Sequence, residues 1–580
     1  MTRARTWIWV TIFALACAAL AHGVHWKHGP HHDDYFLYSW SAEQLLGYIW
    51  VEVRPIGKLF MVAIYQSPEL FTRVIAFLFI FGTAALAGIF VYRTTSQALP
   101  ATVVGLLCLV PFTGVEAAVW TSAVAHFVPA GFFALLSLNA FLSALKAQRS
   151  AWRRLLGGFS AVLLTLAFGS IEPALNFYIM FLGLTLYVCS ENRRQFTSNL
   201  TLLLGSTLVL SVFVVIIYFV FYVDANQVSR RGSIEIPSLN RIVDFLHGYH
   251  IRAFGSAFGR DMQYVAYREG VTAFFDHRLA IFLGVLALGS ASLAIIDWPR
   301  CVSRSSNTQS IVAVWRIAIL IAFSLATTIA TMLLPSILLS NEHGSPRMAY
   351  LPGISFALTL GFSMAVITQW FHNPKFTKAI LAASLCLVFA LTLRTFGYTK
   401  MYQLRQELDQ RQILRLKEAI PPALVGNRGV TFLPISISDE FIDYHIKTNP
   451  RHILLGAFTS PNSVLPVLQD LYADAVNVIR PRYGEMRWRI EVEADAKTMS
   501  VLGLQSDGVR TVSSDDVIIF RYRKDGVIDV VDRLSYQSET GDTVLSVEFP
   551  WATLINDAVG TPTFSLNLSH NQPEYVAVRE

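Results

Sequence analysis

Charged residues are scarce in this sequence. Asp, Glu, Lys and Arg make up 15% of the 580 residues, whereas hydrophobic residues make up 53%. Soluble domains carry about 25% charged residues, so the composition excludes an ordinary soluble protein. The apolar residues gather in runs of about 18 to 25, the length with which a helix crosses a hydrocarbon core of about 30 Å. The sequence therefore predicts an integral membrane protein.

Cysteine and the common nucleotide or metal motifs are also scarce or missing. All five cysteines precede residue 387, which excludes disulfides from the last third of the chain. No zinc-finger spacing, P-loop or GxGxxG before a helix is present, so these binding classes are excluded. The formal net charge of +6 is explained by the Lys and Arg that membrane proteins carry in their loops. We expect no nucleic-acid partner.

The predicted fold class is a polytopic α-helical membrane protein with a C-terminal soluble α+β domain. Eleven apolar segments predict transmembrane helices in residues 1–399, at 7–24, 70–92, 99–112, 123–145, 155–169, 173–189, 200–223, 279–296, 311–339, 348–371 and 379–396. Residues 400–580 are polar and strand-like. There we expect helices at 401–420 and 463–475, strands at 430–435, 488–493, 517–522, 527–531 and 544–549, and a hairpin turn at 524–526.

The charges around the apolar segments predict the topology. Arg3 and Arg5 precede the first segment and place the N-terminus in the cytoplasm. Eleven crossings then put residues 400–580 outside, in the periplasm if the membrane is a bacterial inner membrane. This conclusion depends on the weak segment 99–112, because one crossing fewer would invert everything after it.

Two adjacent carboxylates, Asp33 and Asp34, follow the first segment and face outward in this topology. One of them could simply cap a helix over residues 35–47. Other ionisable residues fall on the same side, however, and carboxylates at membrane depth usually face a partner, a cavity or a substrate path. Together they predict a site at the outer interface, which includes Glu116, His126, Glu172 and Arg347.

Arg54 and Lys58 are candidate phosphate contacts in the same region, with membrane-edge cations that snorkel as the alternative. Glu116 could instead be an ion-pair partner of Arg54 or Arg347. A divalent cation, Mg²⁺ or Mn²⁺, held by His31, His32, Asp33 and Asp34 is a further alternative that the sequence leaves open.

These short motifs resemble the GT-C superfamily of polytopic glycosyltransferases, and in particular the membrane part of transmembrane, tetratricopeptide-repeat-containing O-mannosyltransferases and related bacterial proteins. The matching residues are Asp33-Asp34, Arg54-Pro55, Glu116-Ala117, Trp120-Thr121-Ser122, Glu172 and the stretch from Arg347 through Tyr350 to Pro352. No Gly-Arg follows Ser122, Ile171 stands where a lysine is usual and Pro346 where a Glu is usual, which leaves the donor sugar open. The tail has no 34-residue helical repeat, so the resemblance does not extend to a protein acceptor.

The resemblance implies inverting transfer of a sugar from a polyprenyl-phosphate-linked donor to a glycan, lipid or protein acceptor at the membrane. Asp34 or Asp33 would be the general base. Arg347 would be the main phosphate contact and Arg54 and Lys58 lesser ones. Glu116 and Glu172 would bind and orient substrate or fix neighbouring cations, and His126 and Tyr350 would bind substrate. The alternatives are a transporter or flippase of lipid-linked glycans, and an oligosaccharide polymerase or ligase.

Overall fold

The computed structural model describes most of the chain. The described residues are 2–23, 41–49, 54–67, 69–110, 117, 121–191, 195–222, 260–302, 311–338, 349–371, 373–426, 428–434, 461–472, 477–478, 489–492, 497–502, 509–523, 527–537, 543–569 and 576–578. They fall into two compact units, which divide between Met401 and Tyr402. We call them the helical unit and the C-terminal unit.

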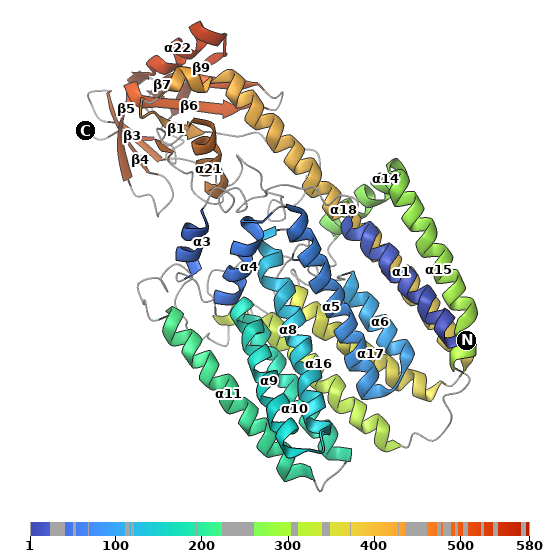
Figure 1. The fold of residues 1–580 in the computed structure, drawn as a ribbon. Helices are drawn as coiled ribbons and strands as arrows, with labels where there is room; N and C mark the ends of the chain where they lie inside the picture. Colours follow the sequence, from blue (N-terminus) through green and yellow to red (C-terminus); the bar gives the residue numbers. More distant parts are fainter. Residues whose placement is uncertain are drawn as a thin grey trace. The chain divides into compact units, whose positions relative to one another are not determined.

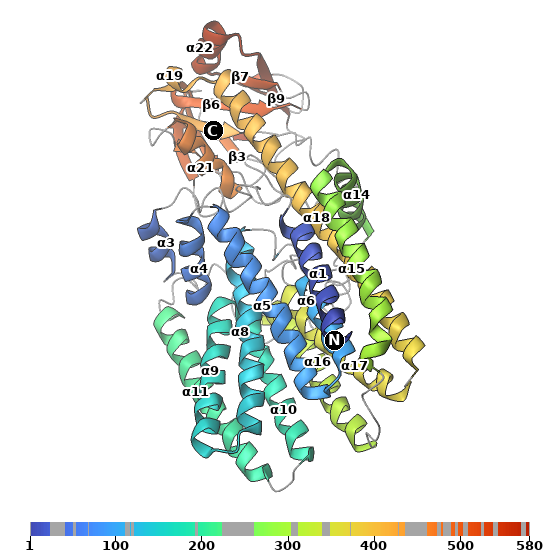
Figure 2. The same ribbon diagram turned by 45° about the vertical axis from the view of Figure 1, so that its right-hand side comes forward.

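The helical unit contains ten described helical segments that are long and apolar enough to cross a membrane, so the chain is an integral multi-pass membrane protein. They lie in α1 (Thr2–Gly23), α5 (Glu69–Thr95), α8 (Thr121–Lys146), α9 (Ser150–Ser170), η1 (Glu172–Phe177) with α10 (Tyr178–Glu191), α11 (Phe196–Tyr222), α15 (Arg278–Val302), α16 (Ile311–Leu338), α17 (Tyr350–Trp370) and α18 (Pro374–Ala419). The shorter helices are α3 (Ala42–Ile49), α4 (Pro55–Tyr65), α6 (Ala98–Leu109) and α14 (Arg260–Asp276). Figures 1 and 2 show α8 beside α9, and α1 beside α15.

The predicted crossing at 99–112 differs from the others. It corresponds to α6, which has 12 residues and is buried along most of its length. At 1.5 Å per residue it is about 18 Å long, shorter than a hydrocarbon core of about 30 Å. Val110 follows with φ −116° and ψ 96°, the extended conformation favoured before a proline such as Pro111. The described residues thus contain ten long apolar helices rather than eleven.

Small residues let the helices approach one another closely. On α6, a Cβ added at Gly105 would lie 3.2 Å from the Ala84 carbonyl oxygen of α5. The contact between α14 and α18 is closer, because a Cβ on Gly397 would lie 1.7 Å from the Ala266 carbonyl oxygen and one on Gly270 would lie 1.9 Å from the Leu393 carbonyl oxygen. Association of helices in lipid relies on such close packing.

Polar groups also connect the helices. Ser137 of α8 donates to the Ser160 carbonyl of α9 at 2.7 Å, and Thr328 of α16 donates to Ser355 of α17 at 3.0 Å. Thr399 of α18 donates to the Ala21 carbonyl at the end of α1 at 3.3 Å. These bonds satisfy hydroxyls that would be costly to leave unpaired in lipid.

The C-terminal unit has three layers. A six-stranded sheet runs β2 (Asn477–Val478), β1 (Thr431–Pro434), β6 (Val517–Tyr522), β7 (Ile528–Gln537) and β8 (Thr543–Glu548), with β9 (Thr563–Ser569) parallel to β7. One face packs on the end of α18, α19 (Pro422–Val425), α21 (Pro461–Tyr472) and α22 (Pro550–Val559). The other face packs on a sheet of β10 (Val576–Val578), β3 (Arg489–Val492), β4 (Thr498–Leu502) and β5 (Val509–Ser513).

Strand β6 shows why this unit folds as it does. Its alternate residues Ile518 and Phe520 lie in the core beneath the helices, whereas Val517 and Ile519 lie in the core between the sheets. A strand buried on both faces reads as a continuous apolar run, and the expected strand at 517–522 has the bounds of β6. The region is therefore α+β, as predicted.

Some elements of this unit were predicted from the sequence and others were missed. The expected helix at 463–475 and strands at 430–435, 488–493 and 544–549 correspond to α21, β1, β3 and β8 within a few residues. Strand β7 extends to Gln537 rather than 531, because its second half pairs with β8 and β9. Strands β2, β4, β5, β9 and β10 and helix α22 were missed, and the hairpin turn at 524–526 lies outside the described residues.

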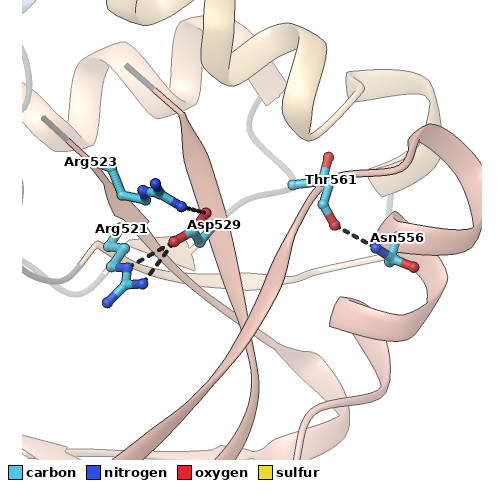
Figure 3. A network of polar contacts seen from close by, with 5 residues as sticks. All are labelled: Arg521, Arg523, Asp529, Asn556 and Thr561. Atoms are coloured by element: carbon cyan, nitrogen blue, oxygen red, sulfur yellow. Dashed lines mark hydrogen bonds and ion pairs between the residues drawn. The ribbon is translucent and has the colours of Figure 1, made fainter. Parts of the chain in front are cut away.

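Side-chain contacts connect neighbouring elements of this unit. Figure 3 shows Arg521 and Arg523, from the end of β6, both directed at Asp529 on β7. Arg521 Nη2 lies 2.8 Å from an Asp529 oxygen. In the same view Asn556 donates to the Thr561 carbonyl at 2.7 Å. Thr561 Oγ1 in turn donates to the Ala419 carbonyl that ends α18 at 2.6 Å. Helix α18 is thus tied to the loop before β9.

Candidate functional site

An ion pair joins two of the predicted site residues. Arg54 Nε donates to both carboxylate oxygens of Glu172, at 3.0 and 2.9 Å. Each residue stands immediately before a proline in the first turn of a helix, Arg54 before Pro55 in α4 and Glu172 before Pro173 in η1. Proline suits that position because its missing N–H has no partner there in any helix. The two side chains are 12% and 27% exposed, so the pair is only partly accessible.

Gly57 brings His126 and the end of α9 to the same place. A Cβ at position 57 would lie 2.0 Å from His126 Nδ1 and 2.7 Å from the Ser170 carbonyl oxygen. Only a residue without a side chain allows this approach of α4 to α8 and α9. His126 is itself buried, with 8% exposure.

Lys58 lies next to Gly57 in the first turn of α4, where its backbone N–H donates to the Arg54 carbonyl at 2.9 Å. Its side chain is buried, with 4% of the residue exposed. A buried ammonium in a membrane protein is costly and is usually found at a site of function or beside a partner. The first turn of α4 therefore carries Arg54, which contacts Glu172, and Lys58, which follows the glycine that meets His126.

Tyr350 lies deeper in the same part of the helical unit. It begins α17 and is 2% exposed. A Cβ on Gly131 of α8 would lie 3.2 Å from its ring. Gly131 follows His126 by five residues, about 7.5 Å along the helix axis. Arg54, Lys58, His126, Glu172 and Tyr350 thus come from four separate segments and gather around one end of α8.

Six predicted residues lie outside the described part of the chain: His31, His32, Asp33, Asp34, Glu116 and Arg347. Their roles stay predictions, and so does the alternative pairing of Glu116 with Arg54 or Arg347. The predicted divalent-cation site lies among them. Within the described residues, no group of three or more His, Cys, Asp and Glu side chains could hold a metal ion.

The charges of the described residues suit an anion. Arg54 and Glu172 form an ion pair, and Lys58 in the same turn is a buried cation, in a partly desolvated place where electrostatic attraction is stronger than in water. Such an arrangement can bind a phosphate and stabilise charge that develops on it.

Gly57 and Ser170 are the neighbours that the sequence did not indicate. Their importance depends on how α4 packs against α8 and α9, which no local pattern reports. Comparison of the chain with protein-family models and with curated proteins finds no match to either.

Proposed function

We propose that this protein is a membrane glycosyltransferase that moves a sugar from a polyprenyl-phosphate-linked donor to an envelope glycan, lipid or protein acceptor. The observation that carries the proposal is the gathering of Arg54, Lys58, His126 and Glu172, which the sequence places in three distant regions, at one end of the helical unit. We further propose a GT-C-like fold, a bacterial inner membrane and a site on its outer face.

The two cations have different tasks in this proposal. Arg54 is held by Glu172 and orients the first turn of α4. Lys58 supplies the positive charge that attracts the donor phosphate and stabilises it as it leaves. The buried surroundings of Lys58 and His126 keep water away, which favours transfer to an acceptor over hydrolysis.

Proton removal from the acceptor hydroxyl is assigned to Asp34 or Asp33. The carboxylate takes the proton while the hydroxyl oxygen attacks the anomeric carbon, and the bond to the donor phosphate breaks with inversion. The chain contributes no covalent intermediate in this scheme.

Asp34→Asn tests the assignment most directly. The variant should abolish transfer at normal abundance, because an amide cannot accept the proton. The measurement is the mass of envelope glycans and glycoproteins in cells that carry the variant, with Asp276→Asn, an exposed residue at the end of α14, as the control. Unchanged glycan mass in the Asp34→Asn cells would refute the general-base role.

A reconstituted assay distinguishes a glycosyltransferase from a transporter or flippase of lipid-linked glycans. Purified protein in vesicles should form a new glycosidic bond from a polyprenyl-phosphate-linked sugar. Movement of the lipid across the bilayer without any such bond would replace the glycosyltransferase with a flippase.

A further inference from the structure

The end of the helical unit opposite the candidate site is rich in cations. Arg93 lies in the last turn of α5, Lys146 ends α8, and Arg149, Arg153 and Arg154 stand at the start of α9. On α8, His126 and Ser143 are seventeen residues apart, about 26 Å along the axis. The sequences of α8, α9 and α11 contain no Asp or Glu. Within the described residues, α8, α9 and α11 therefore offer these arginines no carboxylate.

Neutral oxygens hold two of the arginines. Arg93 Nη1 donates to the Asn139 carbonyl at 3.0 Å, and Arg93 Nη2 donates to Ser143 Oγ at 2.8 Å. Arg153 Nη2 donates to the Asn199 side-chain oxygen. Hydrogen bonds of this kind orient a guanidinium without cancelling its charge.

The residues around Arg153 hold its guanidinium in a fixed orientation. Asn199 is fully buried, and its amide nitrogen also lies 3.5 Å from Cys189 Sγ, so its orientation is set from both sides. Arg153 Nε is buried and has no hydrogen-bond partner in the part of the chain that the structure describes. A guanidinium is planar and presents its donors in a fork that matches phosphate oxygens.

The apolar residues beside Arg153 point to a lipid rather than a free ion. Trp152 and Leu155 flank it on α9, and Phe196 begins the neighbouring α11. All three are exposed large hydrophobic side chains. At the end of a membrane-spanning helix such residues contact the acyl chains and the interface.

We propose that Arg153, oriented by Asn199, binds the phosphate of an anionic membrane lipid at this end of the helical unit, with Trp152, Leu155 and Phe196 against its acyl chains. The site is independent of sugar transfer and lies at the other end of α9 from Ser170. Basic positions between membrane helices are a recurrent place for anionic headgroups.

The test compares two neighbouring arginines in the full-length protein. Binding of phosphatidylglycerol and of phosphatidylcholine is measured by native mass spectrometry of the detergent-purified chain. We expect Arg153→Gln to weaken phosphatidylglycerol binding by about tenfold or more. The exposed Arg154→Gln should weaken it by about fivefold or less, the effect of one charge near a lipid surface. Phosphatidylcholine binding should change little in both.

Three outcomes would overturn the proposal. Equal losses in Arg153→Gln and Arg154→Gln would mean a diffuse attraction of charges, and full competition by glycerol phosphate would mean a free-phosphate site. If Arg153→Gln does not fold, Arg153→Lys replaces it, since lysine keeps the charge and lacks the forked donors. Unchanged affinity in Arg153→Lys would equally reject a site built on the guanidinium.

Discussion

The helical unit and the C-terminal unit hold together by different means. Helices α14 and α18 touch through Gly270 and Gly397, where backbone meets backbone. In the C-terminal unit, Phe432 and Phe520 pack edge to face with ring centroids 6.1 Å apart within a core of large side chains. Lipid gives helices little hydrophobic reason to associate, so close backbone contact replaces it. In water, burial of large apolar groups is the main driving force.

Two ion pairs, one from each unit, differ in burial. Arg54 and Glu172 in the helical unit keep some exposure, whereas Arg405 and Asp409 on α18, at the start of the C-terminal unit, are completely buried, with 2.7 Å between Arg405 Nη2 and Asp409 Oδ1. Removal of both charges from water is expensive, so a fully buried pair is sensitive to the loss of either partner. The cost of breaking the Arg405–Asp409 pair can therefore be measured.

The largest effect is expected for Asp409→Asn. It leaves the Arg405 charge buried without its carboxylate and should lower the free energy of unfolding of the C-terminal unit by about 3 to 5 kcal/mol. Pulse proteolysis of the full chain in urea measures it, with the exposed Asp557→Asn on α22 as the control. The double variant Arg405→Met with Asp409→Leu should regain most of the loss. A loss in the double variant as large as in Asp409→Asn would contradict the charge argument.

Gly397→Ala should have a smaller effect, on the helical unit. The added methyl group would meet the Ala266 carbonyl oxygen, and overpacking of this kind costs about 1 to 3 kcal/mol. Gly289→Ala is the matched control, because nothing lies within 4 Å of a Cβ there. The thermal midpoint in detergent should fall only for Gly397→Ala. Equal midpoints would show that α14 and α18 separate without cost.

The smallest effect concerns Tyr472 of α21. Burial raises the pKa of its hydroxyl, which donates to the Ile420 carbonyl at 2.9 Å. The unfolded side chain ionises near pH 10. The stability that the neutral hydroxyl contributes is therefore complete below about pH 10 and is lost as the pH rises above that value.

Tyr472→Phe should accordingly cost about 1 kcal/mol at neutral pH and make the stability of the C-terminal unit less dependent on pH between about 9 and 11. Urea unfolding of both proteins across this range measures it. Parallel pH profiles for the variant and the unchanged chain would contradict the assignment.

Elements determined by local sequence features were predictable, and pairings between distant residues were not. The apolar run of β6 and the end of α18 before Pro421-Pro422 could be located, because burial on two faces and proline act locally. Strand β9 was missed because its parallel pairing with β7 depends on residues about thirty positions away. The apolar run at 99–112 predicted a helix of full crossing length, whereas α6 ends at Leu109, before Pro111.

In the candidate site, too, single residues could be predicted from the sequence but their pairing could not. Arg54 and Glu172 stood out because charges are rare near apolar segments, yet the alternative considered for Arg54 was Glu116, and the carboxylate that the structure places on it is Glu172. These two residues are 118 positions apart, so only the packing of α4 against α9 and η1 could pair them. The place of Asp33 and Asp34 lies outside the described residues.

Gly57 gives the site an unusual kind of control. The close spacing between α4 and α8 requires that residue 57 has no side chain, since any side chain there would overlap His126. A single methyl group at this position would move the first turn of α4 outward, and both Arg54 and Lys58 would move with it. An uncharged substitution at Gly57 would therefore shift the positions of the Arg54 and Lys58 charges.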